Sequence, residues 1–144
     1  MSLGSRQFAR IARVRRVQHN LASAAAARAA GEAQMLENSS DRLGQLRGAL
    51  GVGAGEATGA TLASLGELAM RLDKAKAGLN VAISGARATA AAREAVRLAA
   101  RRDQESVENL GGKAAATAAR LAERRIPVAR RPRPRLGDEG ETNR

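Results

Sequence analysis

Apolar residues recur every seven positions between Leu62 and Leu121, and this repeat organises most of the chain. One series is Leu65, Leu72, Leu79, Ala86, Arg93, Ala100, Val107, Ala114 and Leu121; a second, three residues further along each time, is Leu68, Ala75, Ala82, Thr89, Val96, Asp103, Leu110 and Thr117. Two such series keep one face of a helix against a partner helix. The pattern therefore predicts a long coiled-coil helix from about Thr61, with Arg93 and Asp103 interrupting its seam.

The segment before residue 48 also has a helical pattern. Ser5 is a suitable N-cap, and small or apolar residues follow at spacings of three and four: Ile11, Val14, Val17, Leu21, Ala24, Gly31 and Met35. The stripe falters at 38–40 and resumes, shifted by one position, at Leu43, Leu46 and Leu50. A one-residue skip alters the supercoil locally without ending a helix, so we expect a first helix from about Ser5 to Arg47.

Glycines between Gly48 and Gly59 separate the two patterns. They lie at 48, 51, 53, 55 and 59, and glycine raises the entropic cost of a helix. The spacing matches neither common phosphate-binding glycine loop, which favours a helix–helix turn. After it, Ser64 and Glu67 have the spacing of a capping box.

Two further glycine pairs leave alternatives open. Gly78 and Gly85 could bracket a second turn and give three helices, but Leu79 and Ile83 continue the stripe between them. Gly111 and Gly112 form a weak point at which the second helix could kink or fray. From residue 126, Pro127, Pro132 and Pro134 alternate with arginines, which predicts an extended, disordered basic tail over 126–144.

These elements predict an all-α fold, in which residues 5–125 form an antiparallel coiled-coil hairpin with its turn at about 48–60. At about 1.5 Å per residue, roughly 30 Å of the longer second helix would overhang the first. We expect the seam beyond Val107 to face no helix of the same chain. The hairpin also brings residues 1–16 near the region after Arg97.

The composition restricts what this rod can be. One aromatic residue and few large apolar residues leave too little material for a globular core, and cysteine is absent. No apolar run reaches the ~18 residues of a membrane span. Residues 1–30 contain arginines and serines but no acid, as mitochondrial presequences do, although the helical pattern continues unbroken past them into Glu32.

No constellation of catalytic or metal-binding residues appears. His19 is the only histidine and is expected at a solvated helix position. Carboxylates stand at ion-pair spacing from arginines, as in Glu94 with Arg97 and Arg101 with Glu105. The sequence therefore predicts a protein that is not an enzyme and that uses no metal or cofactor.

The net charge of +11 is concentrated at the two chain ends. Three partners fit a basic end: nucleic acid, an acidic membrane surface or an acidic protein surface. The lack of stacking aromatics argues against single-strand nucleic acid binding. A solvated face in an arginine-biased proteome would also explain the charge.

The layout resembles the FliJ family of flagellar type III export proteins. The resemblance lies in the length, the hairpin, the segment Arg13-Val-Arg-Arg-Val-Gln18 and the charged last helix, from Ala100-Arg-Arg-Asp-Gln-Glu105 to Leu121-Ala-Glu-Arg-Arg125. It is poorer in lysine, glutamate and aromatics, and richer in alanine and glycine, than that family.

The resemblance implies a cytoplasmic, non-enzymatic coiled-coil protein that associates peripherally with the inner membrane through the export apparatus. It would bind the export ATPase hexamer and the export gate and assist other export chaperones in delivering substrates. The residues expected to contact partners are Arg10, Arg13, Arg15, Arg16, Val107, Leu110, Arg120, Leu121 and Arg124. The competing interpretation is an arginine-rich, nucleoid-associated nucleic-acid-binding protein; an amphipathic helix protein on a granule or membrane is a third.

Overall fold

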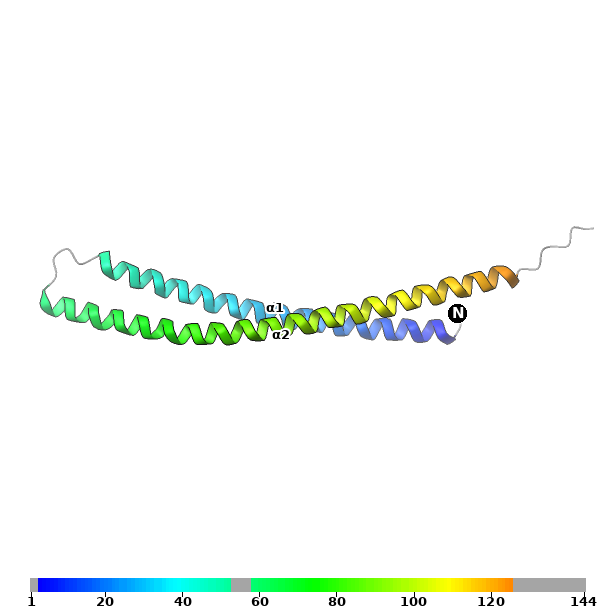
Figure 1. Cartoon of the computed structure of the whole chain (residues 1–144), viewed down its shortest axis with the longest axis horizontal. Coiled ribbons are helices and arrows are strands. Elements are labelled where there is room, and N and C mark those ends of the chain that lie inside the picture. Colours follow the sequence, from blue (N-terminus) through cyan, green and yellow to red (C-terminus); the bar gives the residue numbers. More distant parts are fainter. Residues whose placement is uncertain (1–2, 53–57, 126–144) are drawn as a thin grey trace, which may run out of the picture.

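The computed structural model describes residues 3–52 and 58–125, which form two long helices packed side by side (Figure 1). Helix α1 spans Leu3–Val52 and helix α2 spans Gly59–Arg125. The predicted all-α antiparallel hairpin is confirmed, and α2 is continuous through Gly78 and Gly85, so there is no second turn. The tail predicted over 126–144 lies outside the described residues.

The contact seam, meaning the positions of each helix that face the other, follows a heptad repeat in both helices. Its buried and half-buried positions in α1 include Phe8, Ala12, Arg15, His19, Ala22, Ala26, Ala29, Ala33, Leu36, Ser40, Leu43 and Leu50. Those in α2 include Leu65, Ala69, Leu72, Leu79, Ile83, Ala86, Ala90, Arg97, Ala100, Gln104, Val107 and Gly111.

The observed seam agrees with one of the two series predicted for α2 and differs from the other. The series that starts at Leu65 does face α1 as far as Val107, except at the exposed Arg93, whereas its last two members, Ala114 and Leu121, are exposed. The second series was wrong by one residue, because the facing positions are Ala69, Ile83 and their equivalents, whereas Leu68 and Val96 are exposed. In α1 the predicted stripe was wrong over most of its length, although Leu43 and Leu50 do lie on the seam. Its members Ile11, Val14, Val17, Leu21 and Met35 are between 48% and 69% exposed.

Alanine explains why α1 turns a different face to its partner. Ala26, Ala29 and Ala33 are each 7% exposed, and with Ile83 they are the most buried apolar residues that the structure describes. A methyl side chain allows two helix axes to approach closely, at the lower end of the usual 8–10 Å range. Close packing of small residues therefore replaces a core of large side chains.

Substitution of Ala29 by leucine is expected to destabilise the hairpin by about 1–3 kcal/mol, because the added atoms have no space in a closely packed seam. Ala27→Leu adds the same atoms at an exposed position of the same helix and should change stability by less than about 0.5 kcal/mol. Thermal unfolding followed by circular dichroism measures both. Equal effects of the two substitutions would contradict the assigned seam.

The helix ends differ from those predicted. Helix α1 continues through Gly48 and Gly51 to Val52, since glycine costs only about 1 kcal/mol in a helix and does not forbid one. The cap of α2 is Thr58, whose Oγ1 accepts a hydrogen bond from the Thr61 amide at 3.3 Å. Ser64 instead donates to the carbonyl of Ala60, so the predicted capping box was wrong.

The helices are also displaced relative to the predicted pairing. Gly44 lies against Lys76 and Arg47 forms an ion pair with Asp73 at 3.2 Å, so the first turns of α2 reach past the end of α1 (Figure 1). At the other end Phe8 lies against Gly111. The predicted overhang of roughly 30 Å was therefore wrong, and α1 covers the seam beyond Val107. Only the last two turns of α2 extend past the start of α1.

Ion pairs fix this antiparallel register. Besides Arg47–Asp73, pairs join Arg15 to Asp103 at 3.2 Å, Arg16 to Glu108 at 3.6 Å and Arg87 to Glu37 at 2.6 Å. Exposed pairs contribute only about 0–1 kcal/mol each, but their positions match only in this register. They therefore select the pairing more than they stabilise it.

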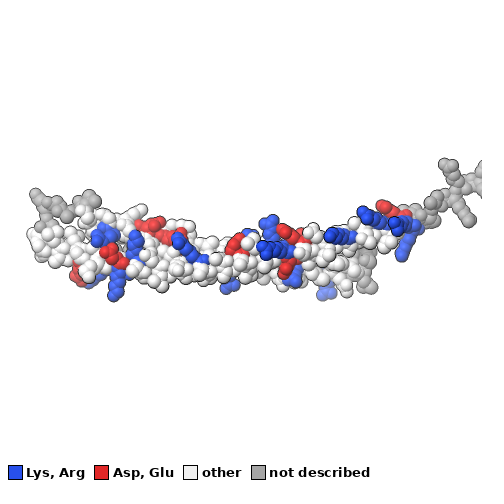
Figure 2. Space-filling model, in the orientation of Figure 1, with Lys and Arg blue, Asp and Glu red and all other residues white. Residues whose placement is uncertain are grey.

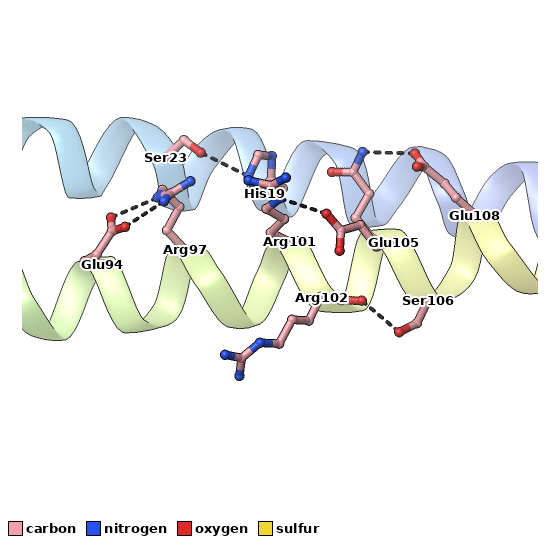
Figure 3. Close-up of polar contacts among 10 residues, drawn as sticks. His19, Ser23, Glu94, Arg97, Arg101, Arg102, Glu105, Ser106 and Glu108 are labelled. Carbon is pink, nitrogen blue, oxygen red and sulfur yellow. Dashed lines mark hydrogen bonds and ion pairs between the residues drawn. The ribbon is translucent and has the colours of Figure 1, made fainter.

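The two predicted pairs within α2 are confirmed (Figure 3). Arg97 donates two hydrogen bonds to Glu94, at 2.8 and 2.6 Å, and Arg101 donates one to Glu105. The hydrogen bonds from Arg97 lower the pKa of Glu94 below its ordinary value, and Glu94 in turn raises the pKa of Arg97. The ionised pair is thus favoured along this side of α2.

Candidate functional site at the basic end of the hairpin

The end of the rod at which α1 begins and α2 finishes is strongly basic. The contacts Phe8–Gly111 and Arg16–Glu108 hold the two segments together there. The cations that they contribute are Arg6, Arg10, Arg13, Arg15, Arg16, Lys113, Arg120, Arg124 and Arg125, against the acids Asp103, Glu108 and Glu123. Figure 2 shows the last of these cations gathered at the end of α2, whereas acidic and basic residues are mixed near the turn.

The four predicted arginines of α1 divide into two kinds. Arg15 and Arg16 form ion pairs with Asp103 and Glu108 of α2. These carboxylates neutralise much of their charge, which leaves less of it to attract a partner. Arg10 and Arg13 are exposed and form no ion pair within the described residues. Because their charge is uncompensated, these two are the members of the predicted four that are most able to attract an acidic partner.

The predicted residues of α2 lie at three kinds of position. Val107 is half-buried on the seam, where it packs against α1. Its main role is therefore to stabilise the hairpin, not to contact a partner. Leu110 is 55% exposed on the side of the helix. Arg120, Leu121 and Arg124 lie in the last turns, which extend past α1. The hairpin thus brings the predicted residues of α1 and α2 to the basic end. Of these, Val107, Arg15 and Arg16 already contact the opposite helix and are less available to a partner protein.

An apolar crevice between the two helices opens at this end. Its volume is about 380 Å³, and it is lined by small and apolar residues with one carboxylate: Gly4, Ser5, Phe8, Ala9, Ala12, Val107, Glu108, Gly111, Ala114, Ala115 and Ala118. The seam is under-filled here because glycine and alanine face the ring of Phe8. The crevice has room for an apolar side chain of a partner. Arg10 lines a separate recess on α1.

Sequence reasoning did not identify this crevice. Phe8, Gly111, Ala114 and Ala118 were not among the predicted site residues. The available signal was the combination of a glycine pair and an alanine-rich segment with the only aromatic residue of the chain. That signal becomes useful only once the register places Phe8 opposite Gly111.

His19 is not at a solvated position as predicted. It is half-buried on the seam, and Ser23 Oγ lies 3.4 Å from its Nε2 atom (Figure 3). Over residues 3–52 and 58–125, no three residues of the metal-binding types gather into a metal site. Neither described helix has an apolar stretch long enough to cross a bilayer.

The arrangement at the basic end therefore offers attraction of acidic groups and burial of an apolar side chain, both of which are binding functions. Uncompensated arginines act over a distance of about 8–10 Å at moderate salt, and the crevice acts only on contact. Comparisons of the chain with protein-family models, curated proteins and solved structures find no match.

Proposed function

We propose that this chain is a non-enzymatic coiled-coil component of the flagellar type III protein export apparatus, which binds the export ATPase ring through the basic end of the hairpin. It also contacts the export gate and assists export chaperones in delivering their substrates. The observation that carries the proposal is the joining of both helix ends in one narrow basic tip, which combines exposed arginines such as Arg10 and Arg13 with an apolar crevice between the helices.

The shape and charge support this proposal in separate ways. A two-helix rod is narrow enough to enter the central opening of a ring, and the paired helices make it stiffer than a single helix. A basic tip is attracted to an acidic opening and is oriented by it before contact. The resemblance to the FliJ family supplies the identity of the ring.

Reversal of Arg10 and Arg13, two uncompensated arginines of the basic end, tests the proposal. Arg10→Glu/Arg13→Glu is expected to weaken binding to the purified export ATPase hexamer by about tenfold or more, since each reversed contact replaces an attraction with a repulsion. Neither side chain pairs with α2, so the hairpin should remain folded, which circular dichroism verifies. Binding is measured by surface plasmon resonance with the full chain.

The matched control is Arg42→Glu/Lys74→Glu. It makes the same change of net charge nearer the turn, at two exposed residues that form no ion pair in the described part of the chain. The control should bind the hexamer as the wild type does. Equal loss in both variants would point to net charge alone, and an absence of hexamer binding by the wild type would overturn the proposal.

The nucleic-acid alternative is separated by a gel-shift measurement at near-physiological salt. The export proposal predicts no tight complex with a random DNA duplex. Tight binding that weakens steeply as salt is raised would instead assign the arginines to phosphate contacts.

A further inference from the structure

The two flanks of the hairpin, on either side of the seam, differ in character. The seam of each helix has two alternating positions per heptad. Residues directly after the first seam position lie on one flank of the hairpin, and residues directly before the second seam position lie on the other flank. The first flank is polar: it includes Arg16, Glu37, Arg87, Glu94 and Glu108. Figure 3 shows Glu94, Arg101 and Glu108 in a row along the side of α2 that borders α1.

The opposite flank is apolar in both helices, and we call it the apolar flank. Ile11, Leu68, Val96 and Leu110 each come directly before a seam residue (Ala12, Ala69, Arg97 and Gly111), and Leu46 holds the equivalent position near the end of α1. All five are between 45% and 56% exposed. These are large side chains that the hairpin leaves half in water.

The apolar flank widens onto α1. Val14, Leu21 and Met35 stand beside it at 55%, 67% and 69% exposure. Between the large residues lie Ala25, Ala75 and Ala82, whose short side chains leave space for the side chains of a bound helix. Near the basic end, the α1 side of the flank has a recess of about 590 Å³, lined by Ile11 and Val14 together with Gln7, Arg10, Arg15 and Gln18. A row of exposed apolar residues on two parallel ridges, with small residues between, is the form of a groove that accepts a further helix.

The charges around the apolar flank identify the helix that would fit. Arg10, Arg28 and Arg42 lie along its α1 side, and Lys113 and Arg120 along its α2 side. Of the acids on the flank, Asp103 is already paired with Arg15, which leaves Glu32. A second copy of this chain would bring these cations against one another, and like charges in contact are unfavourable.

We propose that the apolar flank binds an amphipathic helix of a partner protein, whose apolar stripe is bordered by aspartate and glutamate. The bound helix completes a three-helix bundle: its apolar side chains cover Ile11, Val96 and Leu110, and its carboxylates meet the surrounding arginines and lysines. This surface is distinct from the crevice at the basic end and does not depend on the identity of the partner that binds there.

Two synthetic peptides test the proposal with the full chain. Both carry leucine at the seam positions of three heptads; one has glutamate at the flanking positions and the other has lysine. Fluorescence anisotropy is expected to give at least tenfold tighter binding of the glutamate peptide, with one peptide per chain. Equal binding of both peptides, or binding of neither, would overturn the proposal.

Paired variants locate the site. Val96→Glu/Leu110→Glu places two charges on the apolar flank and should weaken binding of the glutamate peptide by tenfold or more. Val81→Glu/Met70→Glu makes the same charge change at residues that are 76% and 73% exposed elsewhere on α2, and should bind the peptide as the wild type does. Equal binding by both variants would place the peptide elsewhere and contradict the proposal.

Two other measurements identify competing occupants of the flank. Sedimentation equilibrium of the wild-type chain should show a monomer. A dimer that Val96→Glu/Leu110→Glu converts to monomers would assign the flank to a second copy. Vesicles of phosphatidylserine should bind the wild type and the Val96→Glu/Leu110→Glu variant equally; selective loss of vesicle binding in that variant would assign the flank to lipid.

Discussion

Ile83→Ala is expected to lower the free energy of unfolding by about 2–3 kcal/mol, near the lower limit for buried isoleucine. Ile83 is 8% exposed and is the one buried residue of α2 among those that the structure describes. The other buried apolar residues that the structure describes are alanines, so Ile83 supplies buried apolar surface that no other buried side chain of this seam replaces. The loss should lower the unfolding midpoint by about 10 °C for a chain of this size.

Val81→Ala is the matched control for this substitution. Val81 is two residues away on the same helix and 76% exposed, and alanine has the higher helix propensity. The control should therefore be neutral or slightly stabilising. Urea unfolding followed by the helical circular dichroism signal compares the two variants; equal losses would mean that α2 does not turn the Ile83 face to α1.

The hairpin itself was predictable because its determinants are local. The series from Leu65 to Val107 keeps one face of α2 apolar over many turns, and no proline interrupts either helix. Glycines near residue 53 favour a reversal. Each of these features acts within a few residues, so the sequence pattern alone contains it.

The face of α1 was not predictable from hydrophobicity. Ile11, Val14 and Leu21 are more apolar than Ala22, Ala26 and Ala29, yet the alanines form the seam. Packing is a property of both surfaces together, and small residues on α1 allow a close approach that larger side chains would prevent. The exposed stripe is therefore a second apolar surface, to which we assign the binding of another helix.

The basic end was predictable in outline but not in detail. Charge counting and an antiparallel turn suffice to bring residues 1–16 near the end of α2. Whether Arg15 and Arg16 are free, and whether Phe8 faces a glycine, depends on the register of the two helices. That register is fixed by distant contacts such as Arg47–Asp73, which no local pattern specifies.

The central claim is that the start of α1 and the end of α2 pack together in one chain, and a disulfide cross-link tests it most directly. A Cβ atom at position 111 would lie 3.9 Å from the Cβ of Phe8, within the range of disulfide geometry. The natural chain has no cysteine, so an introduced pair has no competitor. The control is Phe8→Cys/Gly112→Cys, because a Cβ at Gly112 would meet no atom within 4 Å.

We expect Phe8→Cys/Gly111→Cys to form an intramolecular disulfide rapidly and almost completely under mild oxidation, seen as a fast-migrating monomer on a non-reducing gel. The Gly112 control should cross-link far more slowly. Cross-linking at equal rates, or only between chains, would contradict the hairpin and the basic end built on it.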